Sequence, residues 1–186
     1  SSYANTVLQI FCRNGKHKSM SIAQKHVVIT RTVAQAQPFV DALVAQHAIP
    51  IVYPCLDIVP LLTTPQLHTL VSQIFMGRYD WLFITSANAV RVLHQQCHEC
   101  EIDWVIPAHM RIAAVGKQTA QAIQDTWQCT VDLVSHAQTA SALVTALSTY
   151  MPRHVCWLST SQADDHFCKS RMTVDRIDVY ESMTSQ

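Results

Sequence analysis

Apolar residues along the chain fall into two alternating patterns, which predict strands and helices in turn. Mostly continuous apolar runs, typical of strands covered on both faces, occupy residues 27–30, 81–84, 111–115, 131–134, 154–158 and 176–182. Apolar residues three or four apart predict amphipathic helices, at residues 34–46, 65–77, 118–127 and 139–149 and directly after TSAN at 85–88. Strands that alternate with helices predict a doubly wound α/β fold with a parallel sheet covered on both faces.

Residues 49–61 (IPIVYPCLDIVPL) form an apolar stretch that fits neither pattern. Pro50, Pro54 and Pro60 forbid a helix, because proline lacks the N–H group that a helix interior needs. They also forbid a central strand that is paired along its whole length. We therefore expect this stretch to leave one sheet and to continue as a linker between two parts of the chain.

Composition and charge narrow the possible partners. The chain has 186 residues, of which 49% are hydrophobic and 14% charged, and its formal net charge is zero. This balance argues against a broad nucleic-acid surface, which needs clustered lysine and arginine. No apolar run approaches the roughly 20 residues of a membrane span. The seven cysteines, without a secretory signal pattern, predict reduced thiols in a cytoplasmic protein.

Two polar turns are the candidate ligand-binding segments. Each follows a predicted strand and leads directly into a helix, and together they contain Thr85, Ser86, Asn88, Gly116, Lys117 and Thr119. Because the carboxyl ends of parallel strands meet at one edge of a sheet, both turns can present backbone N–H groups to the same cleft. Unpaired N–H groups at a helix N-terminus attract anions. The alternative is that both turns are ordinary helix caps.

Motifs for other chemistries are weak. The chain contains neither of the glycine-rich nucleotide-binding motifs and no G-x-S-x-G nucleophile turn. The most metal-like stretch is HQQCHEC, in which Cys97 and Cys100 have zinc-knuckle spacing and His94 and His98 share a helix face. A single Cys-x-x-Cys without a second ligand pair is a weak signal. We expect the polar end of a surface helix here, and no bound metal.

Several segments together resemble the uroporphyrinogen-III synthase family. They are found in the family's order between residues 26 and 182: VVITRTVAQAQPFVDALVAQHAIPIVYPCLDIVPL, YDWLFITSANAV, RIAAVGKQTAQAI, VDLVSHAQTASALVTAL and DRIDVYES. The tyrosine-aspartate strand that leads to TSANAV, followed by AAVGKQTA, is the most specific combination. The resemblance implies two flavodoxin-like, doubly wound lobes joined by a two-stranded linker, with the first lobe incomplete in this chain.

The resemblance also predicts how the chain is divided. The first lobe starts within residues 20–53, the linker is 54–61, the second lobe is 62–175 and the return linker is 176–186. Family members are expected to be monomers. If the first lobe is incomplete, the helix at 34–46 exposes apolar residues and self-association is expected.

The family converts hydroxymethylbilane, a linear tetrapyrrole with carboxylate side chains, to uroporphyrinogen III in haem biosynthesis, without metal or cofactor. It removes the hydroxymethyl oxygen as water, closes the ring and inverts the last pyrrole through a spiro intermediate. Tyr180 matches the tyrosine proposed to protonate the departing hydroxyl. Arg31 and the two polar turns are the candidate contacts for the substrate carboxylates. Backbone N–H groups would reconcile a neutral protein with a polyanionic substrate.

Two alternatives stay open at this point. The chain could be a catalytically inactive fragment or a small-molecule-binding flavodoxin-like module. A receiver-like signalling domain is disfavoured, because that chemistry needs acidic residues at strand ends. The predicted strands before the two polar turns are followed by Thr85 and Gly116 instead.

The first 19 residues are predicted to lie outside the fold. They show neither a helical nor a strand period of useful length, whereas Met20 opens a stretch that resembles an ordinary protein start. Deletion of residues 1–19 should therefore leave the melting temperature of the chain nearly unchanged, as measured by circular dichroism. A large drop in melting temperature would contradict this interpretation.

Overall fold

The computed structural model describes residues 21–135, 139–163 and 172–184, so the predicted extension at 1–19 lies outside the described residues. The chain divides into two compact units. One comprises Ser1–Asp57 with Met183–Gln186, and the other comprises Ile58–Ser182. Within the described residues, the helices are all too short or too polar to cross a membrane.

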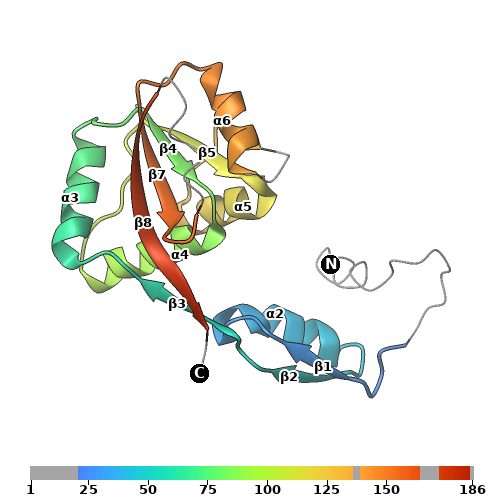
Figure 1. The fold of residues 1–186 in the computed structure, drawn as a ribbon. Helices are drawn as coiled ribbons and strands as arrows, with labels where there is room; N and C mark the ends of the chain where they lie inside the picture. Colours follow the sequence, from blue (N-terminus) through green and yellow to red (C-terminus); the bar gives the residue numbers. More distant parts are fainter. Residues whose placement is uncertain (1–20, 136–138, 164–171, 185–186) are drawn as a thin grey trace. The chain divides into compact units, whose positions relative to one another are not determined.

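Among its described residues, the first unit contains a small parallel sheet and one helix. β1 (His26–Ile29) pairs in parallel with β2 (Ile49–Val52), and α2 (Val33–Val44) connects them (Figure 1). On the face away from the buried core, the paired residues Val28 and Ile51 are 57% and 41% exposed. Among the described residues of this unit, the buried core consists of Ile29, Ala36, Leu43 and Ala48.

The second unit is built on a six-stranded sheet with the strand order β3-β8-β7-β4-β5-β6. β4 is central and pairs in parallel with β5 on one side and β7 on the other. β6 and β8 continue the parallel pairing outward, so the carboxyl ends of these five strands point to the same edge. The strands are β3 (Leu56–Pro60), β4 (Trp81–Ile84), β5 (Arg111–Val115), β6 (Leu133–Ser135), β7 (His154–Thr160) and β8 (Thr173–Thr184).

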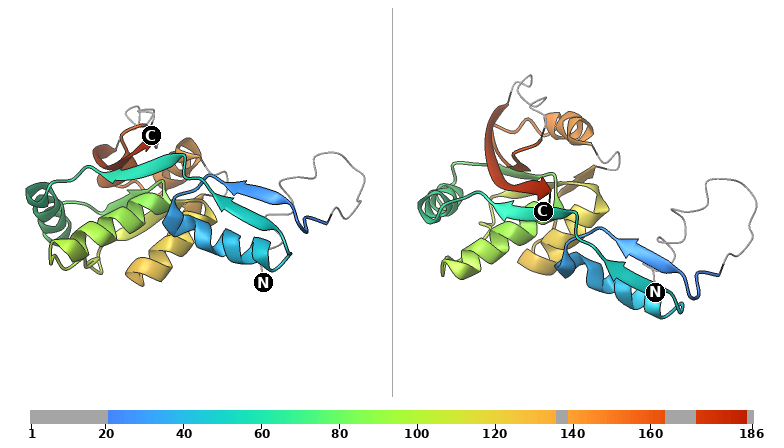
Figure 2. Two further views of the ribbon diagram at one scale, coloured as in Figure 1. Left: turned by 90° about the horizontal axis from the view of Figure 1, so that it is seen from below. Right: turned by 60° about the horizontal axis from the view of Figure 1, so that its bottom comes forward.

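Helices cover both faces of this sheet (Figures 1 and 2). On one face, three helices pack on a core that includes Leu82 and Ile84. On the other face, one helix of the described residues places Leu143 and Leu147 against a core that contains Phe83. All four residues of β4 are therefore buried. The helices are α3 (Thr64–Phe75), α4 (Ala87–Glu99) and α5 (Gly116–Trp127) on the first face and α6 (Ala140–Ser148) on the second.

The predicted α/β architecture is confirmed, with local corrections. The helix predicted at 118–127 starts at Gly116, whose φ of 75° is a conformation that other residues rarely adopt. The strand predicted at 131–134 shifts to Leu133–Ser135, because the carboxylate of Asp132 accepts the N–H of Ile112 at 2.8 Å. The predicted extended stretch forms two strands, β2 and β3, with Pro54 between them.

Aspartates stabilise the amino-terminal edge of the sheet. The carboxylate of Asp80 accepts the backbone N–H groups of Arg153 and His154, at 2.8 and 2.7 Å. Asp132 does the same for Ile112 on β5. These bonds satisfy backbone donors where the strands begin, which would otherwise be left without a partner. They fix the start of β7 beside the start of β4.

Asp175 is the centre of a polar cluster at the same edge. Its Oδ2 accepts hydrogen bonds from Arg78 Nη2 at 2.9 Å and from the Tyr79 hydroxyl at 3.0 Å. His154 Nε2 lies 3.2 Å from the same oxygen, at ion-pair distance but not aligned as a donor. Partial burial raises the pKa of Asp175, but His154, Arg78 and Tyr79 together lower it further, so the pKa is below its ordinary value.

The lowered pKa predicts how stability depends on pH. A carboxylate whose pKa falls on folding stabilises the folded state above its unfolded pKa, and this stabilisation is lost as the pH falls through the folded pKa. Asp175→Asn should lower the free energy of unfolding by about 1–3 kcal/mol near neutral pH. The difference from the unmodified chain should shrink below about pH 4.

Urea denaturation at neutral and at acidic pH checks this prediction. Asp125→Asn is the matched control, because the bond from Gln121 to Asp125 joins two exposed side chains on one helix. Such a bond contributes only a few tenths of a kcal/mol, so the control should change stability little at either pH. An equal loss for Asp175→Asn at both pH values would contradict the role of the ionised carboxylate.

Candidate functional site

Ser86 and Tyr180 meet at the carboxyl edge of the sheet. The Ser86 Oγ and the Tyr180 hydroxyl oxygen are 2.9 Å apart. Ser86 is the N-cap of α4, and its Oγ also accepts the backbone N–H of Asn88 at 3.1 Å. Tyr180 is only 5% exposed, and its side chain belongs to the core between the sheet and α4. The phenol is thus held by packing around its ring and by a hydrogen bond at its tip.

A β-bulge in β8 directs Tyr180 toward Ser86. Ser159 of β7 pairs with Asp178, but the next residue, Thr160, pairs with Tyr180, so Val179 is an extra residue in β8. In an unbroken strand, neighbouring side chains point to opposite faces. Because of the bulge, Val179 and Tyr180 both belong to the core on the α4 face. Bulges commonly redirect side chains in this way beside functional sites.

Backbone hydrogen bonds fix the bulge. The carbonyl of Val179 accepts the N–H of Leu61, which follows β3, at 2.9 Å. The carbonyl of Tyr180 accepts the N–H of Ser161, which follows β7, at 3.1 Å. Segments on both sides of β8 therefore hold the two residues whose side chains share a face. The position of the Tyr180 hydroxyl is set by the backbone as well as by Ser86.

The second polar turn lies beside the first at this edge. Ile84 at the end of β4 is in register with Ala114 of the parallel strand β5. The turn that carries Ser86 and the turn that carries Gly116 therefore leave neighbouring strands in the same direction. In the second turn Thr119 is buried and Lys117 is exposed. The first backbone N–H groups of a helix lack intrahelical partners, so two helix N-termini at one edge favour anionic groups there.

The remaining candidate residues, Thr85, Asn88 and Arg31, lie outside the contact between Ser86 and Tyr180. Thr85 and Asn88 flank the capped turn and are half-buried. Arg31 belongs to the first unit, where its guanidinium lies 4.9 Å from the centre of the Phe39 ring. Within the second unit, the structure therefore brings Ser86 and Tyr180 into direct contact and places the second turn on the neighbouring strand.

Sequence reasoning missed the residues that shape the site without taking part in it. The sequence did not indicate the bulge at Val179 or the hydrogen bond from the Ser161 N–H to the backbone carbonyl of Tyr180. One signal was present: in RIDVYES the polar and apolar residues alternate until Val179 and Tyr180, which are adjacent and both apolar. A break in alternation of this kind is what an extra strand residue produces.

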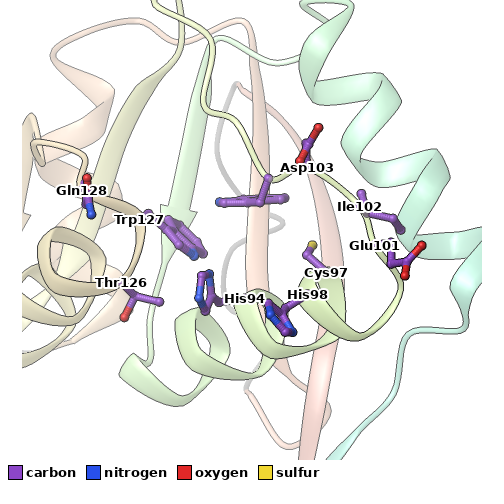
Figure 3. A pocket seen from close by; sticks show the side chains of 10 residues that line it. His94, Cys97, His98, Glu101, Ile102, Asp103, Thr126, Trp127 and Gln128 are labelled. Carbon is purple, nitrogen blue, oxygen red and sulfur yellow. The ribbon is translucent and has the colours of Figure 1, made fainter.

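The HQQCHEC segment does not form a metal site among the residues that the structure describes, where no three His, Cys, Asp or Glu side chains are grouped to hold an ion. It lines a hollow of about 410 Å³ (Figure 3), together with Trp104 and Trp127, whose ring centres are 5.0 Å apart. Cys97 is buried in the core, whereas the Sγ of Cys100 lies 3.5 Å from Thr64 Oγ1. The spacing of the two cysteines therefore reflects the packing of α4.

Burial also predicts low reactivity for Cys97. It raises the pKa of the Cys97 thiol to about 11, with a further contribution from Cys100. Near pH 8 only about one Cys97 thiol in a thousand is ionised, and the thiolate is the reactive form. Iodoacetamide should therefore modify the half-buried Cys55 well before Cys97 in the folded chain, as followed by peptide mass mapping. In urea the two should react at similar rates. Equal rates in the folded chain, or a Cys97–Cys100 disulfide after mild oxidation, would contradict this.

Comparisons with known proteins agree on one family. The family model described as uroporphyrinogen-III synthase HemD matches residues 37–186. The chain is 27% identical to the porphyrin biosynthesis protein HemD of Ruminiclostridium josui over 99 residues. This match covers 53% of this chain and 19% of that protein. The chain is also 34% identical to the uroporphyrinogen-III synthase of Synechococcus elongatus over 100 residues. This match covers 53% of this chain and 36% of that protein.

A solved structure shows the same fold. A mutant uroporphyrinogen III synthase from Thermus thermophilus matches with a TM-score of 0.59 and 15% identity, over 87% of this chain and 64% of that chain. This chain therefore spans less than two thirds of the length of each of these three proteins. Because the family model matches most of its residues, the chain belongs to the uroporphyrinogen-III synthase family.

Proposed function

We propose that this chain cyclises hydroxymethylbilane, a linear tetrapyrrole with carboxylate side chains, to uroporphyrinogen III with loss of water. The observation that carries the proposal is the contact between Ser86 and Tyr180 at the edge where α4 and α5 begin. That edge combines a phenolic proton donor with two helix N-termini that favour anions. Membership of the family supports the reaction class.

Tyr180 is the proposed general acid. Its phenol gives a proton to the hydroxymethyl oxygen of the bilane, and the carbon–oxygen bond breaks to release water. The resulting azafulvenium cation is electrophilic, and a pyrrole carbon of the last ring attacks it to form a spiro intermediate. Rearrangement inverts that ring, and its aromaticity returns when a ring carbon loses a proton, which balances the proton given by Tyr180. No metal or cofactor takes part in this scheme.

Positioning supplies the selectivity in this proposal. Without control, the bilane closes without inverting its last ring, so the protein must hold the substrate where the inverting attack is favoured. Backbone N–H groups at the starts of α4 and α5 would bind the carboxylates, assisted by Thr85, Asn88, Gly116, Lys117 and Thr119. A chain of zero net charge can thus bind a polyanion through local dipoles.

We extend the proposal to the first unit through Arg31. Arg31 follows β1 closely along the chain, as Ser86 follows β4. A guanidinium in that position suits a carboxylate, because it offers paired donors. In this scheme residues 54–61 and 176–186 are the two-stranded linker between the lobes, and 20–53 and 62–175 belong to the first and second lobes.

Incubation of the purified chain with freshly prepared hydroxymethylbilane tests the function. After oxidation, chromatography separates the porphyrin isomers, and an excess of isomer III over the isomer I that forms spontaneously is the expected result. Tyr180→Phe should slow the formation of isomer III by about 10²-fold, near the low end of the range for general acids, because a phenol is a weak acid. The melting temperature should change little.

Tyr150→Phe is the matched control, because Tyr150 is half exposed and its ring packs beside Trp81. This variant should form isomer III at the unmodified rate. If the unmodified chain yields only isomer I, the proposed activity is wrong for this chain. Full activity of Tyr180→Phe would remove Tyr180 from the mechanism while leaving the reaction in place.

A further inference from the structure

We propose that Ser86 is a positioning residue that donates its hydroxyl proton to the Tyr180 oxygen and so leaves the phenol proton free to reach the substrate. The catalytic consequence rests on the proposed function. The direction of the hydrogen bond does not rest on it, because this bond is present without a substrate. The inference gives Ser86 a role that acts through Tyr180, in place of direct contact with substrate carboxylates.

The donors and acceptors around Ser86 favour this direction. A serine hydroxyl has one proton to donate and two lone pairs that accept. The backbone N–H of Asn88 can only donate, so it occupies one lone pair of the Ser86 Oγ, at 3.1 Å. A hydroxyl that accepts a hydrogen bond is polarised and becomes a better donor itself. The favoured chain therefore runs from the Asn88 N–H through the Ser86 hydroxyl to the Tyr180 oxygen, 2.9 Å away.

The N-terminus of α4 favours the same direction. It carries the partial positive charge of the helix, and Ser86 is its N-cap. This partial positive charge stabilises electron density on the Tyr180 oxygen, which is the last acceptor in the chain of hydrogen bonds. When Tyr180 gives up its proton, the phenolate that remains keeps the hydrogen bond from Ser86. The opposite direction would occupy the phenol proton and require that bond to break before each transfer.

In this proposal, the hydrogen bond from Ser86 sets the direction in which the phenol proton of Tyr180 points. The ring of Tyr180 is buried and the bulge at Val179 fixes its backbone, so the hydroxyl oxygen has a defined position. The remaining freedom is rotation of the proton about the bond from ring to oxygen. A donor at 2.9 Å restricts that rotation, which is a form of preorganisation.

The first experiment measures the hydrogen bond without substrate. In chain labelled with ¹³C at tyrosine Cζ, Tyr180→Phe assigns the Tyr180 NMR signal. Donation by a phenol moves its Cζ signal downfield, toward the phenolate position, and acceptance moves it upfield. Ser86→Ala should therefore move the Tyr180 signal downfield, and Ser86→Thr should restore it. An unchanged signal, or an upfield shift, would overturn the proposed direction.

Thr139→Ala is the matched control for the loss of a helix cap. Thr139 is the N-cap of α6 and its hydroxyl accepts the N–H of Ala142 at 3.3 Å, as Ser86 does for Asn88 in α4. This variant removes a comparable cap and should leave the Tyr180 signal and the activity unchanged. If Ser86→Ala proves too unstable to study, Ser86→Gly removes the hydroxyl while keeping most of the capping stability.

The second experiment separates positioning from binding by kinetics with hydroxymethylbilane. Ser86→Ala should lower kcat for isomer III by about tenfold, the effect of one well-placed hydrogen bond, and change KM by less than about twofold. In the Tyr180→Phe background the same substitution should have no further effect. A raised KM, or an equal loss in both backgrounds, would show direct substrate binding and overturn the positioning role. If the unmodified chain makes no isomer III, the proposed function fails and the NMR result alone decides this inference.

Discussion

Parallel pairing of β4 with β5 and β7 is the constraint on which the rest of the second unit depends. Parallel neighbours cannot be joined by a tight turn, so each connection must cross back along the sheet, and helices fill these crossings. With helices on both faces, β4 is entirely buried. Every helix that follows one of these strands then starts at the carboxyl edge. The site follows from this geometry, because Ser86 caps the helix after β4 and Gly116 opens the helix after β5.

The two edges of the sheet have different chemistry. At the amino edge, Asp80, Asp132 and Asp175 accept backbone N–H groups or cationic and phenolic donors. The two turns at the carboxyl edge, TSAN and GKQT, contain no acidic residue. At these two turns, no side-chain carboxylate opposes the partial positive charge of the helix N-termini. A neutral chain can in this way present an edge that favours anions, which is what the proposed substrate requires.

Sequence reasoning could name both members of the central contact but could not join them. The runs at 81–84 and 111–115 were identifiable because doubly covered strands are continuously apolar, and both are found with these bounds. Ser86 was identifiable as a cap from the turn before α4. Its contact with Tyr180 spans 94 positions and depends on the bulge at Val179. A bulge is defined by the partner strand as well as by its own residues, so local alternation alone could not place the Tyr180 hydroxyl.

The turns after β1 and β4 show how one local device can serve two purposes. In both, a short parallel strand leads through a threonine into a helix: Thr30 before α2 and Thr85 before α4. Among the described residues, Thr32 caps α2 without a side-chain hydrogen bond, whereas the Ser86 hydroxyl binds both the helix backbone and a phenol. The turn of the first unit instead carries a guanidinium, on Arg31. The two strand-to-helix turns therefore have similar places in the chain but carry different side-chain chemistry.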